Sequence, residues 1–272
     1  MAIVGNRADA GSIYLEDVCY SYESGVVALQ NLNVEIPLGS RLAIVGPSGC
    51  GKTTLLHLLA GILSPDRGQI AWPRIASASH VRSMVFQTDT LLPWLNVLDN
   101  VGLAFRLRGK GRKAYSGRAH ELLTLVGLER FAHAYPYELS GGMRRRVAFL
   151  SALAPNPAVL LLDEPFAALD EPTRLAIHQD VLKILAETQM TLVVITHDIA
   201  EAITLCDTVS IMSNRPGRVV STHSVPFGHD RDPYDLRKTD SFLNLYRSLW
   251  QTLSEQLTRR AGDDGSQDHG NG

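Results

Sequence analysis

Short hydrophobic runs alternate with helical patterns along most of this chain. Residues 13–22 alternate between apolar and polar side chains, as in a strand with one buried face. We predict further strands at 41–45, 68–72, 82–86, 159–162, 192–195 and 209–212. The run at 159–162 is continuously apolar, which is typical of a parallel strand that is buried on both sides. Strands that alternate with helices favour an α/β fold with a mainly parallel sheet covered on both faces.

The middle of the chain, about 88–157, has a different pattern. Predicted strands disappear there, and helical periodicity appears at 97–107, 118–126 and 142–153. A helical segment that interrupts a sheet implies a second lobe. After the last strand, a helix at 239–258 is expected, with one apolar face. That face consists of Phe242, Leu245, Tyr246, Leu249, Leu253 and Leu257. We interpret it as packing on the protein's own core, with docking of a second subunit as the alternative.

The composition excludes several classes of protein. The 272 residues are 45% hydrophobic and 20% charged, which is ordinary for a folded globular chain. The net charge of −2 gives no excess of positive charge for nucleic acid or an anionic membrane. No apolar run approaches the roughly 20 residues that cross a bilayer, and no secretory signal is visible. Three scattered cysteines, Cys19, Cys50 and Cys206, favour a reducing compartment, so we expect a cytoplasmic protein.

A glycine-rich segment between a predicted strand and a predicted helix matches the pattern G-x-x-x-x-G-K-[ST]. It reads Gly46-Pro47-Ser48-Gly49-Cys50-Gly51-Lys52-Thr53. The glycines let successive backbone N–H groups turn inward around a phosphate, and the helix that begins near Lys52 adds its positive dipole end. Lys52 would bind the β- and γ-phosphates, and the Thr53 hydroxyl would be a ligand for Mg²⁺. The pattern predicts a nucleotide site, but kinases, GTPases and motor ATPases all use it.

Polar residues follow two of the predicted strands. The run 159–162 ends in Asp163 and Glu164, and a parallel strand delivers its carboxyl end to the ligand crevice. Asp163 is placed to hold Mg²⁺, directly or through water, and Glu164 to orient and deprotonate the attacking water. His197 follows a strand expected to end at the same edge, from which it would contact the γ-phosphate. Alone, these residues would be interpreted as a solvated turn and a surface histidine. The phosphate loop on the same predicted sheet favours the functional interpretation.

A second helix start has the character of an anion site. Ser140 is expected to cap a helix that opens with Gly141, Gly142 and Met143. Its hydroxyl, bare backbone N–H groups and dipole would all face an anion, although an ordinary capped helix has the same sequence. Because the chain already has a phosphate loop, the second start makes sense if it faces the nucleotide of another molecule.

These motifs together resemble the ATP-binding-cassette (ABC) family, in its transporter ATPase subunit form, over about residues 13–225. The resemblance implies a P-loop NTPase (RecA-like) core with N-terminal antiparallel β elements and an inserted α-helical subdomain. The implied domains are a flexible N-terminus 1–11, a core of 12–87 and 158–225, a helical signature subdomain 88–157, a C-terminal helical extension 226–260 and a disordered tail 261–272.

The resemblance also implies roles for individual residues. Tyr22 would stack on adenine, Thr54 would join the phosphate loop in binding ATP, and Gln87 would contact Mg²⁺ and the attacking water. Asp170 ends the segment Ala167-Ala168-Leu169-Asp170, which resembles the loop that crosses the dimer seam, and His197 resembles the switch histidine. Ser140, Gly141 and Gly142 would bind the γ-phosphate held on the opposite subunit, so that two ATP molecules lie at a head-to-tail interface between two copies. The catalytic set is therefore Lys52, Gln87, Glu164 and His197, and the Mg²⁺ set is Thr53, Gln87 and Asp163.

Four residues depart from the commonest family pattern. Met143 and Arg145 stand where glutamine is frequent, Ser151 where arginine is usual, and Ala167 where serine or glycine is usual. None replaces a residue of the implied chemistry, so they leave the turnover rate open rather than the activity.

Residues 85–101, with Leu-Leu-Pro-Trp at 91–94, resemble the nitrate, sulfonate and taurine importer ATPases, as do 163–174 and 212–219. Such a chain works with two transmembrane permease subunits and indirectly with a solute-binding protein, at the cytoplasmic face of the inner membrane. The apolar cluster 91–94 would be either a groove for a short permease helix or local packing. The basic stretch 106–118 is interpreted as a solvated connector, with contact to anionic lipid as the weaker alternative.

Other functions are weighed against this one. A non-transport ABC ATPase in DNA repair or translation would carry coiled-coil insertions or a second cassette, and the charge of −2 disfavours nucleic acid. A small-molecule kinase would not explain Leu139–Gly142 or His197. An importer ATPase of another substrate class stays open, because nitrate, sulfonates, taurine and pyrimidine precursors all fit this branch.

Overall fold

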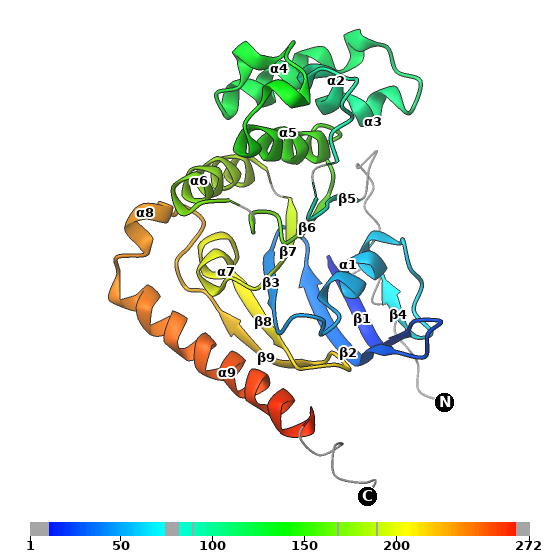
Figure 1. Ribbon diagram of the computed structural model, residues 1–272, viewed down its shortest axis with the longest axis vertical. Helices are drawn as coiled ribbons and strands as arrows, with labels where there is room; N and C mark the ends of the chain where they lie inside the picture. Colours follow the sequence, from blue (N-terminus) through cyan, green and yellow to red (C-terminus); the bar gives the residue numbers. More distant parts are fainter. Residues whose placement is uncertain (1–10, 74–81, 89, 168, 189, 265–272) are drawn as a thin grey trace, which may run out of the picture. The chain divides into compact units, whose positions relative to one another are not determined.

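The computed structural model describes residues 11–73, 82–88, 90–167, 169–188 and 190–264 (Figure 1). They belong to two compact units. The first unit combines Met1–Arg74 with Val194–Gly272, and the second is Ile75–Val193. Because the chain leaves the first unit and later returns to it, each unit is described separately below.

The first unit begins with a three-stranded antiparallel sheet in the order β2-β1-β4. Its strands are β1 (Ser12–Ser21), β2 (Val27–Pro37) and β4 (Arg67–Ala71). The alternating pattern correctly predicts β1, whose Ile13 lies opposite Ile36 of β2 and whose Tyr14 lies opposite Ala71 of β4. Gly68 has a φ of 78°, and a side chain there would overlap the carbonyl oxygen of Glu16, so β4 needs glycine at this position.

A second sheet of the first unit carries the phosphate loop. In strand order it contains the end of β7 (Thr191–Thr196), then β3 (Arg41–Val45), β8 (Thr208–Met212) and β9 (Val219–Ser224). β3 and β8 are parallel, and β9 is antiparallel to β8. All five residues of β3 are buried, as is typical of a central parallel strand that is covered on both faces.

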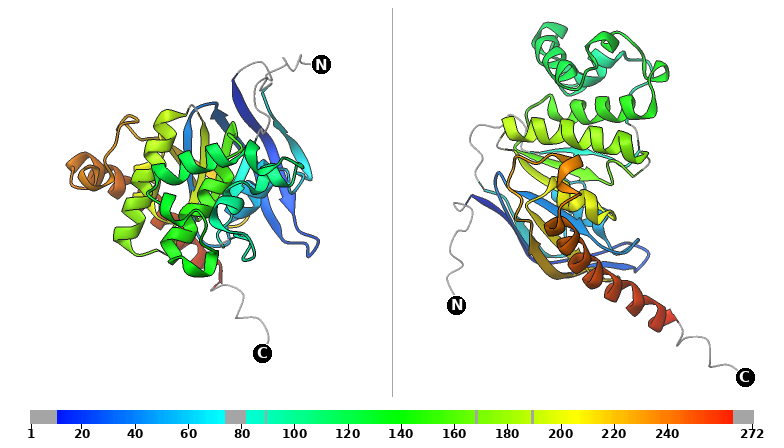
Figure 2. Two further views of the ribbon diagram at one scale, coloured as in Figure 1. Left: turned by 90° about the horizontal axis from the view of Figure 1, so that it is seen from above. Right: turned by 90° about the vertical axis from the view of Figure 1, so that its left-hand side faces the viewer.

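The helices in the described residues of the first unit are α1 (Lys52–Ala60), α7 (Ile199–Leu205), α8 (Pro233–Leu236) and α9 (Asp240–Asp264). α9, orange to red in Figures 1 and 2, packs against α7 and β8. Phe242, Leu249 and Leu253 are buried there, which confirms the prediction that this face covers the protein's own core. Leu257 is 43% exposed, and the helix continues six residues beyond its predicted end.

The second unit contains β5 (Arg82–Val85) and β6 (Val159–Asp163), which are parallel, followed in strand order by the start of β7. Its helices are α2 (Val97–Val101), α3 (Leu103–Arg106), α4 (Ser116–Leu125), α5 (Gly141–Leu153) and α6 (Glu171–Glu187), with short 3-10 turns at 112–114, 129–131 and 136–138. Within the described part of 88–157 every regular element is helical, as predicted.

One predicted helix is wrong in its continuity. The pattern at 97–107 predicts a single helix, but α2 ends at Val101 and α3 starts at Leu103. The break falls at Gly102, where a Cβ would overlap the ring of Tyr115. The close approach of an aromatic ring from a later segment therefore sets this boundary, which local periodicity does not reveal.

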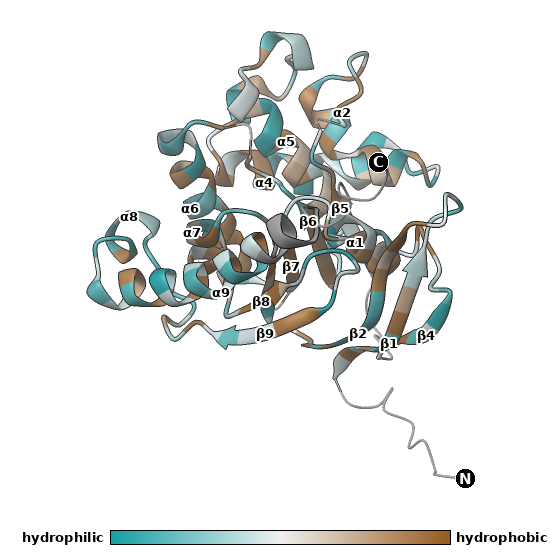
Figure 3. Cartoon of the chain, turned by 60° about the horizontal axis from the view of Figure 1, so that its bottom comes forward, coloured by the Kyte–Doolittle hydropathy of each residue, from teal (hydrophilic) through white to brown (hydrophobic). Residues whose placement is uncertain are grey.

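Apolar residues concentrate on the inner strands and helices. In Figure 3 the hydrophobic colour follows β7 and β8, whereas much of α9 is hydrophilic. Among the described residues, no helix combines the length and the apolarity that a membrane span requires. Cys19, Cys50 and Cys206 are all free thiols.

Candidate nucleotide-binding and catalytic residues

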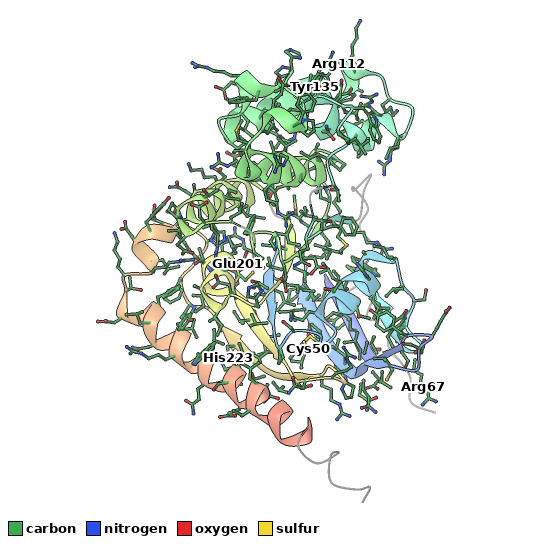
Figure 4. The ribbon with its side chains drawn as sticks, in the orientation of Figure 1. Cys50, Arg67, Arg112, Tyr135, Glu201 and His223 are labelled. Atoms are coloured by element: carbon green, nitrogen blue, oxygen red, sulfur yellow. The ribbon has the colours of Figure 1, made fainter. Side chains whose placement is uncertain are left out.

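The phosphate loop has the backbone that its glycines allow. β3 leads into residues 46–51, and α1 begins at Lys52; Cys50 is labelled in this loop in Figure 4. Gly49 and Gly51 have φ of 75° and 105°, in the left-handed region that favours glycine. A Cβ on Gly51 would also lie 2.8 Å from the carbonyl oxygen of Ala28. Both glycines are therefore required by conformation, and the second also by space.

Lys52 is held against this loop. Its side chain is almost buried, with 6% of the residue exposed, and its ammonium donates to the carbonyl oxygens of Gly46 at 2.8 Å and Pro47 at 2.9 Å. The Cys50 sulfur lies 3.9 Å from the same nitrogen. Burial raises the pKa of the Cys50 thiol more than the nearby Lys52 charge lowers it, so the thiol stays protonated at neutral pH. The net positive charge of the ammonium thus remains in the loop.

Tyr22 and Thr54 are brought together in the first unit. The Tyr22 hydroxyl and the Thr54 Oγ1 are 2.6 Å apart, and the Tyr20 ring packs edge-on against the Tyr22 ring at 5.2 Å. Tyr22 is 42% exposed, so part of its ring stays open to solvent beside α1. An aromatic ring with a free face next to the phosphate-loop helix suits stacking on a base.

A turn between β8 and β9 supports the phosphate loop. The Arg215 guanidinium donates from Nε and Nη2 to the Gly49 carbonyl oxygen, both at 3.1 Å. Gly217 pairs with the backbone of Ala28 through a 2.9 Å hydrogen bond and packs so tightly that a Cβ would overlap the carbonyl oxygen of Cys50. The turn therefore fixes two successive loop carbonyls from outside. Sequence reasoning assigned 212–219 to a family branch and missed this contact.

Asp163 is the last residue of β6 in the second unit, and Glu164 follows it. Asp163 is buried, and Glu164 is partly exposed with a φ of 43°, a left-handed conformation that few residues other than glycine adopt. The Gln87 amide donates to Glu164 Oε2 at 3.3 Å, so two residues of the expected catalytic set meet. An unusual backbone at a strand end next to carboxylates is a common feature of functional sites.

The start of α5 has the expected cap. Ser140 Oγ accepts the Met143 N–H at 3.3 Å, which confirms the predicted N-cap, and Ser140 and Gly141 are both exposed. A Cβ on Gly142 would lie 2.8 Å from Cγ2 of Thr173 on α6. Asp170 precedes α6 and is exposed; a hydrogen bond with Thr173 lowers the pKa of its carboxyl. Ala168 lies outside the described residues.

Three successive arginines on α5 make three different contacts. Arg144 donates to the Leu139 carbonyl oxygen at 2.8 Å, and Arg146 forms an ion pair with Asp180 of α6 at 3.1 Å. Arg145 reaches the backbone that follows β6, where it donates to the carbonyl oxygens of Glu164 and Pro165. Burial raises the pKa of Asp180 more than Arg146 lowers it.

His197 lies directly after β7 in the first unit, and its side chain is exposed. The next residue, Asp198, caps α7 by accepting the N–H groups of Ala200 at 2.8 Å and Glu201 at 3.1 Å. Figure 4 labels Glu201 on this helix, where its carboxylate accepts the Thr196 hydroxyl. The two neighbours of His197 are thereby fixed, which fixes the backbone from which the imidazole projects.

A buried asparagine holds the backbone of the apolar cluster 91–94. Asn100, 1% exposed, accepts the Leu92 N–H at 2.8 Å and donates to the carbonyls of Leu92 and Leu95. This amide stands in for the hydrogen bonds that an irregular turn lacks, and the turn leaves Trp94 70% exposed. The sequence analysis did not identify Asn100, since an asparagine inside a helix has no distinctive pattern.

The basic stretch 106–118 is partly tied down. Asp99 forms ion pairs with Arg106 at 3.6 Å and Arg112 at 3.5 Å, and it accepts the Tyr115 hydroxyl at 2.7 Å. Figure 4 labels Arg112 in this region. The Arg106 and Arg112 side chains are 39% and 50% exposed, so solvent still reaches both of them.

β3 is a buried strand, and it leads through the glycine-rich loop 46–51 to α1, which begins at Lys52. This arrangement defines a P-loop nucleotide-binding protein of the α/β class. The family model described as ABC transporter matches residues 29–167. The chain is 40% identical over 243 residues to the taurine import ATP-binding protein TauB of Jannaschia sp. (strain CCS1), covering 86% of this chain and 91% of that one.

Two solved structures resemble the fold. The dimeric post-hydrolysis structure of the ATP-binding cassette MJ0796 bound to ADP and Pi is 32% identical, with a TM-score of 0.69, over 79% of this chain and all of that one. The cbiO1 protein from Clostridium perfringens, part of the ABC transporter complex cbiONQ, is 27% identical, with a TM-score of 0.70, over 85% of this chain and 92% of that one. This chain belongs to the ABC transporter family, and it is an ATP-binding ATPase of that family.

Proposed function

We propose that this protein is the ATP-hydrolysing subunit of an importer, and that two copies clamp two ATP molecules between them to drive uptake through two separate permease subunits. Similarity to a taurine import ATP-binding protein supports the importer assignment, and similarity to a dimeric cassette supports the pair of copies. The cytoplasmic face of the inner membrane is the expected location, because ATP is available there.

ATP binding would use groups of the first unit. Tyr22 stacks on adenine, and the N–H groups of the loop 46–51 surround the phosphates together with the positive end of the α1 dipole. The Lys52 ammonium, now on two carbonyl oxygens, moves onto the β- and γ-phosphate oxygens. Thr54 adds its hydroxyl. Each of these groups is a donor or an aromatic face, which suits a purine triphosphate.

The residues present also fit Mg²⁺. Thr53 offers an exposed hydroxyl on the first turn of α1, Asp163 a carboxylate and Gln87 an amide oxygen, and hard oxygen donors are the ligands that Mg²⁺ prefers. When bound, Mg²⁺ neutralises charge on the β- and γ-phosphate oxygens. These three residues would hold it.

In the hydrolytic step, Glu164 accepts a proton from water while the water oxygen forms a bond to the γ-phosphorus. The bond from that phosphorus to the bridging oxygen of ADP breaks, which gives ADP and inorganic phosphate. Gln87, hydrogen-bonded to Glu164 at 3.3 Å, orients this carboxylate and the water. Lys52 and His197 of the same copy, together with the partner subunit's Ser140, stabilise the negative charge on the transferring phosphoryl group. Asp170 would lie at the seam between the copies.

The observation that carries the proposal is the exposed start of α5. Ser140 and Gly141 present a capped helix of 13 residues, Gly141–Leu153, to solvent in a chain that already has a phosphate loop. An uncovered N-terminus of such a helix is suited to a second anion, and a nucleotide on another copy supplies it.

The test uses Glu164→Gln, measured by size-exclusion chromatography and ATPase assay. We expect this variant to bind ATP, to hydrolyse it at least 10²-fold more slowly, the scale of a lost general base, and to accumulate as a dimer. Adding Ser140→Arg, which fills the exposed helix start, should prevent that dimer. Near-normal turnover by Glu164→Gln would show that Glu164 is not the general base. If Glu164→Gln stayed monomeric with and without ATP, the proposed ATP-bound dimer would be refuted.

A small sulfonate such as taurine is the solute we propose, since the chain spans 91% of a taurine import relative. The solute class is tested by uptake of labelled taurine, another sulfonate and nitrate into vesicles that hold the assembled complex. Uptake of nitrate alone would refute it. Co-purification with nucleic acid in place of membrane proteins would favour the non-transport alternative.

A further inference from the structure

The residue proposed as the catalytic base has a strained backbone. Glu164 has a φ of 43°, which L-residues with a side chain adopt infrequently. It follows β6 directly and has no glycine's freedom to reach this conformation. Such a backbone persists only where the surroundings hold it in place. Other groups must therefore fix the peptide units around Glu164.

One buried side chain makes that contact. Arg145, with only 7% of the residue exposed, donates from Nη2 to the Glu164 carbonyl oxygen at 3.3 Å and from Nε to the Pro165 carbonyl oxygen. The guanidinium is planar and rigid, so two of its N–H groups fix two carbonyl oxygens in one plane. Residues 145, 164 and 165 all belong to the second unit.

Fixing these carbonyls constrains the Glu164 side chain. The direction of the Glu164 carbonyl is determined by the ψ angle of Glu164, and the direction of the Pro165 carbonyl by the ψ angle of the next residue in the turn. With both held, the Cα–Cβ bond of Glu164 has one direction, and the Gln87 amide meets its carboxylate at 3.3 Å from the other side. The carboxylate is therefore positioned from its backbone by Arg145 and from its tip by Gln87.

We propose that Arg145 is a positioning residue that holds the Glu164 backbone in the conformation from which its carboxylate deprotonates water. The proposal rests on the assignment of Glu164 as base. Arg145 acts through two carbonyl oxygens, and it stands on the second turn of α5, whose exposed start carries Ser140.

The neighbouring arginine provides a matched control. Arg146 has the same charge and lies next along the same helix, but it pairs with Asp180 of α6 rather than with the backbone after β6. The comparison of Arg145→Met with Arg146→Met on the full chain separates loss of a helix arginine from loss of the grip on Glu164. ATPase kinetics, equilibrium binding of ATP and thermal unfolding are measured for both.

For Arg145→Met we expect kcat to fall by about 30- to 100-fold, the scale of a displacement near 1 Å at a catalytic group, with the dissociation constant for ATP within about threefold. Arg145→Lys, which keeps one donor, should give an intermediate kcat. Arg146→Met should keep kcat within about threefold, because its ion pair is with Asp180 of α6 and not with the backbone around Glu164.

The double variant decides whether Arg145 acts through Glu164. If it does, Arg145→Met added to Glu164→Gln lowers the residual rate by less than about threefold, because the group it positions is already lost. If Arg145→Met lowered the rate of the Glu164→Gln protein by the same 30- to 100-fold that it lowers the rate of the wild-type protein, the proposal would be overturned. So would an equal loss of kcat in Arg146→Met, or an unchanged kcat in a folded Arg145→Met protein. If Glu164→Gln alone retains normal turnover, the role of Glu164 fails first, and the two failures are thereby distinguished. Should Arg145→Met fail to fold, kcat and the ATP dissociation constant of Arg145→Lys, together with the same double variant built with Lys, give the answer.

Discussion

Replacing Gly217 by alanine should weaken ATP binding from behind the phosphate loop. Gly217 lies in the turn between β8 and β9, where it donates its N–H to Ala28 and accepts that of Gln30. Its φ is outside the left-handed region, so alanine brings no backbone strain. The substitution therefore tests space alone.

The structure sets the size of the effect. A Cβ at 217 would overlap the Cys50 carbonyl oxygen and lie 2.6 Å from Cε of Met212, whereas real Cβ atoms come no closer than 3.0 Å to a neighbour. The methionine end can rotate away, but the Cys50 carbonyl belongs to the phosphate loop. Relieving the overlap needs a displacement on the order of 1 Å, which at a binding or catalytic group corresponds to a loss of ~10²-fold. Because the turn and the loop share the movement, we expect a 10- to 100-fold weaker affinity, or about 1.4–2.7 kcal/mol.

Equilibrium binding of a fluorescent ATP analogue measures this directly. Gly117→Ala is the control, because a Cβ on Gly117 meets nothing within 4 Å and α4 gains a better helix former. The control should bind ATP normally and unfold at a slightly higher temperature. Wild-type affinity in a folded Gly217→Ala protein would refute the reasoning that this turn sets the loop geometry.

Three further outcomes follow from buried or exposed groups. Arg231 is buried, and its guanidinium pairs with Asp207 at 2.6 Å and donates to the carbonyls of Ile203 and Cys206 at the end of α7. Arg231→Met should therefore lower the free energy of unfolding by about 3 kcal/mol, which corresponds to a fall of roughly 6–12 °C in the midpoint of thermal unfolding. A fall of less than 2 °C would contradict this prediction. Burial raises the pKa of the Cys50 thiol, so the neutral thiol stabilises the fold up to the ordinary thiol pKa of about 8.5, and this contribution is lost as the pH rises further. Labelling of Cys50 by iodoacetamide, followed by mass spectrometry, should therefore be slow at pH 7 and become faster as the pH rises. Labelling at the rate of a free thiol at pH 7 would argue against this prediction. Trp94→Ala should abolish permease-stimulated ATPase and uptake in the assembled complex, and retention of both would exclude a docking role for the cluster 91–94.

The sequence predicts what local pattern determines. The apolar run of β3, the glycines of the loop and the helix at Lys52 follow one another along the chain, so the phosphate loop is recognisable without tertiary information. The N-cap at Ser140 is local in the same way. In contrast, the break at Gly102 depends on the ring of Tyr115, which reaches it only after folding. β2 was also missed, because its apolar residues do not alternate regularly.

The contacts that escaped prediction share one physical form. Arg215 binds the carbonyl of Gly49, and Arg145 binds that of Glu164. In a planar trans peptide the N–H points opposite to the carbonyl, so a donor that holds the carbonyl also fixes the N–H and the neighbouring side chain. A protein that binds phosphate with backbone N–H groups must direct the matching carbonyls away from the ligand, toward donors elsewhere. No spacing rule marks such donors, because any long side chain that folding brings to the carbonyl serves. Positioning residues of a backbone-lined site are therefore found from the partners of its carbonyl groups, and Arg145 and Arg215 are two examples that this criterion identifies.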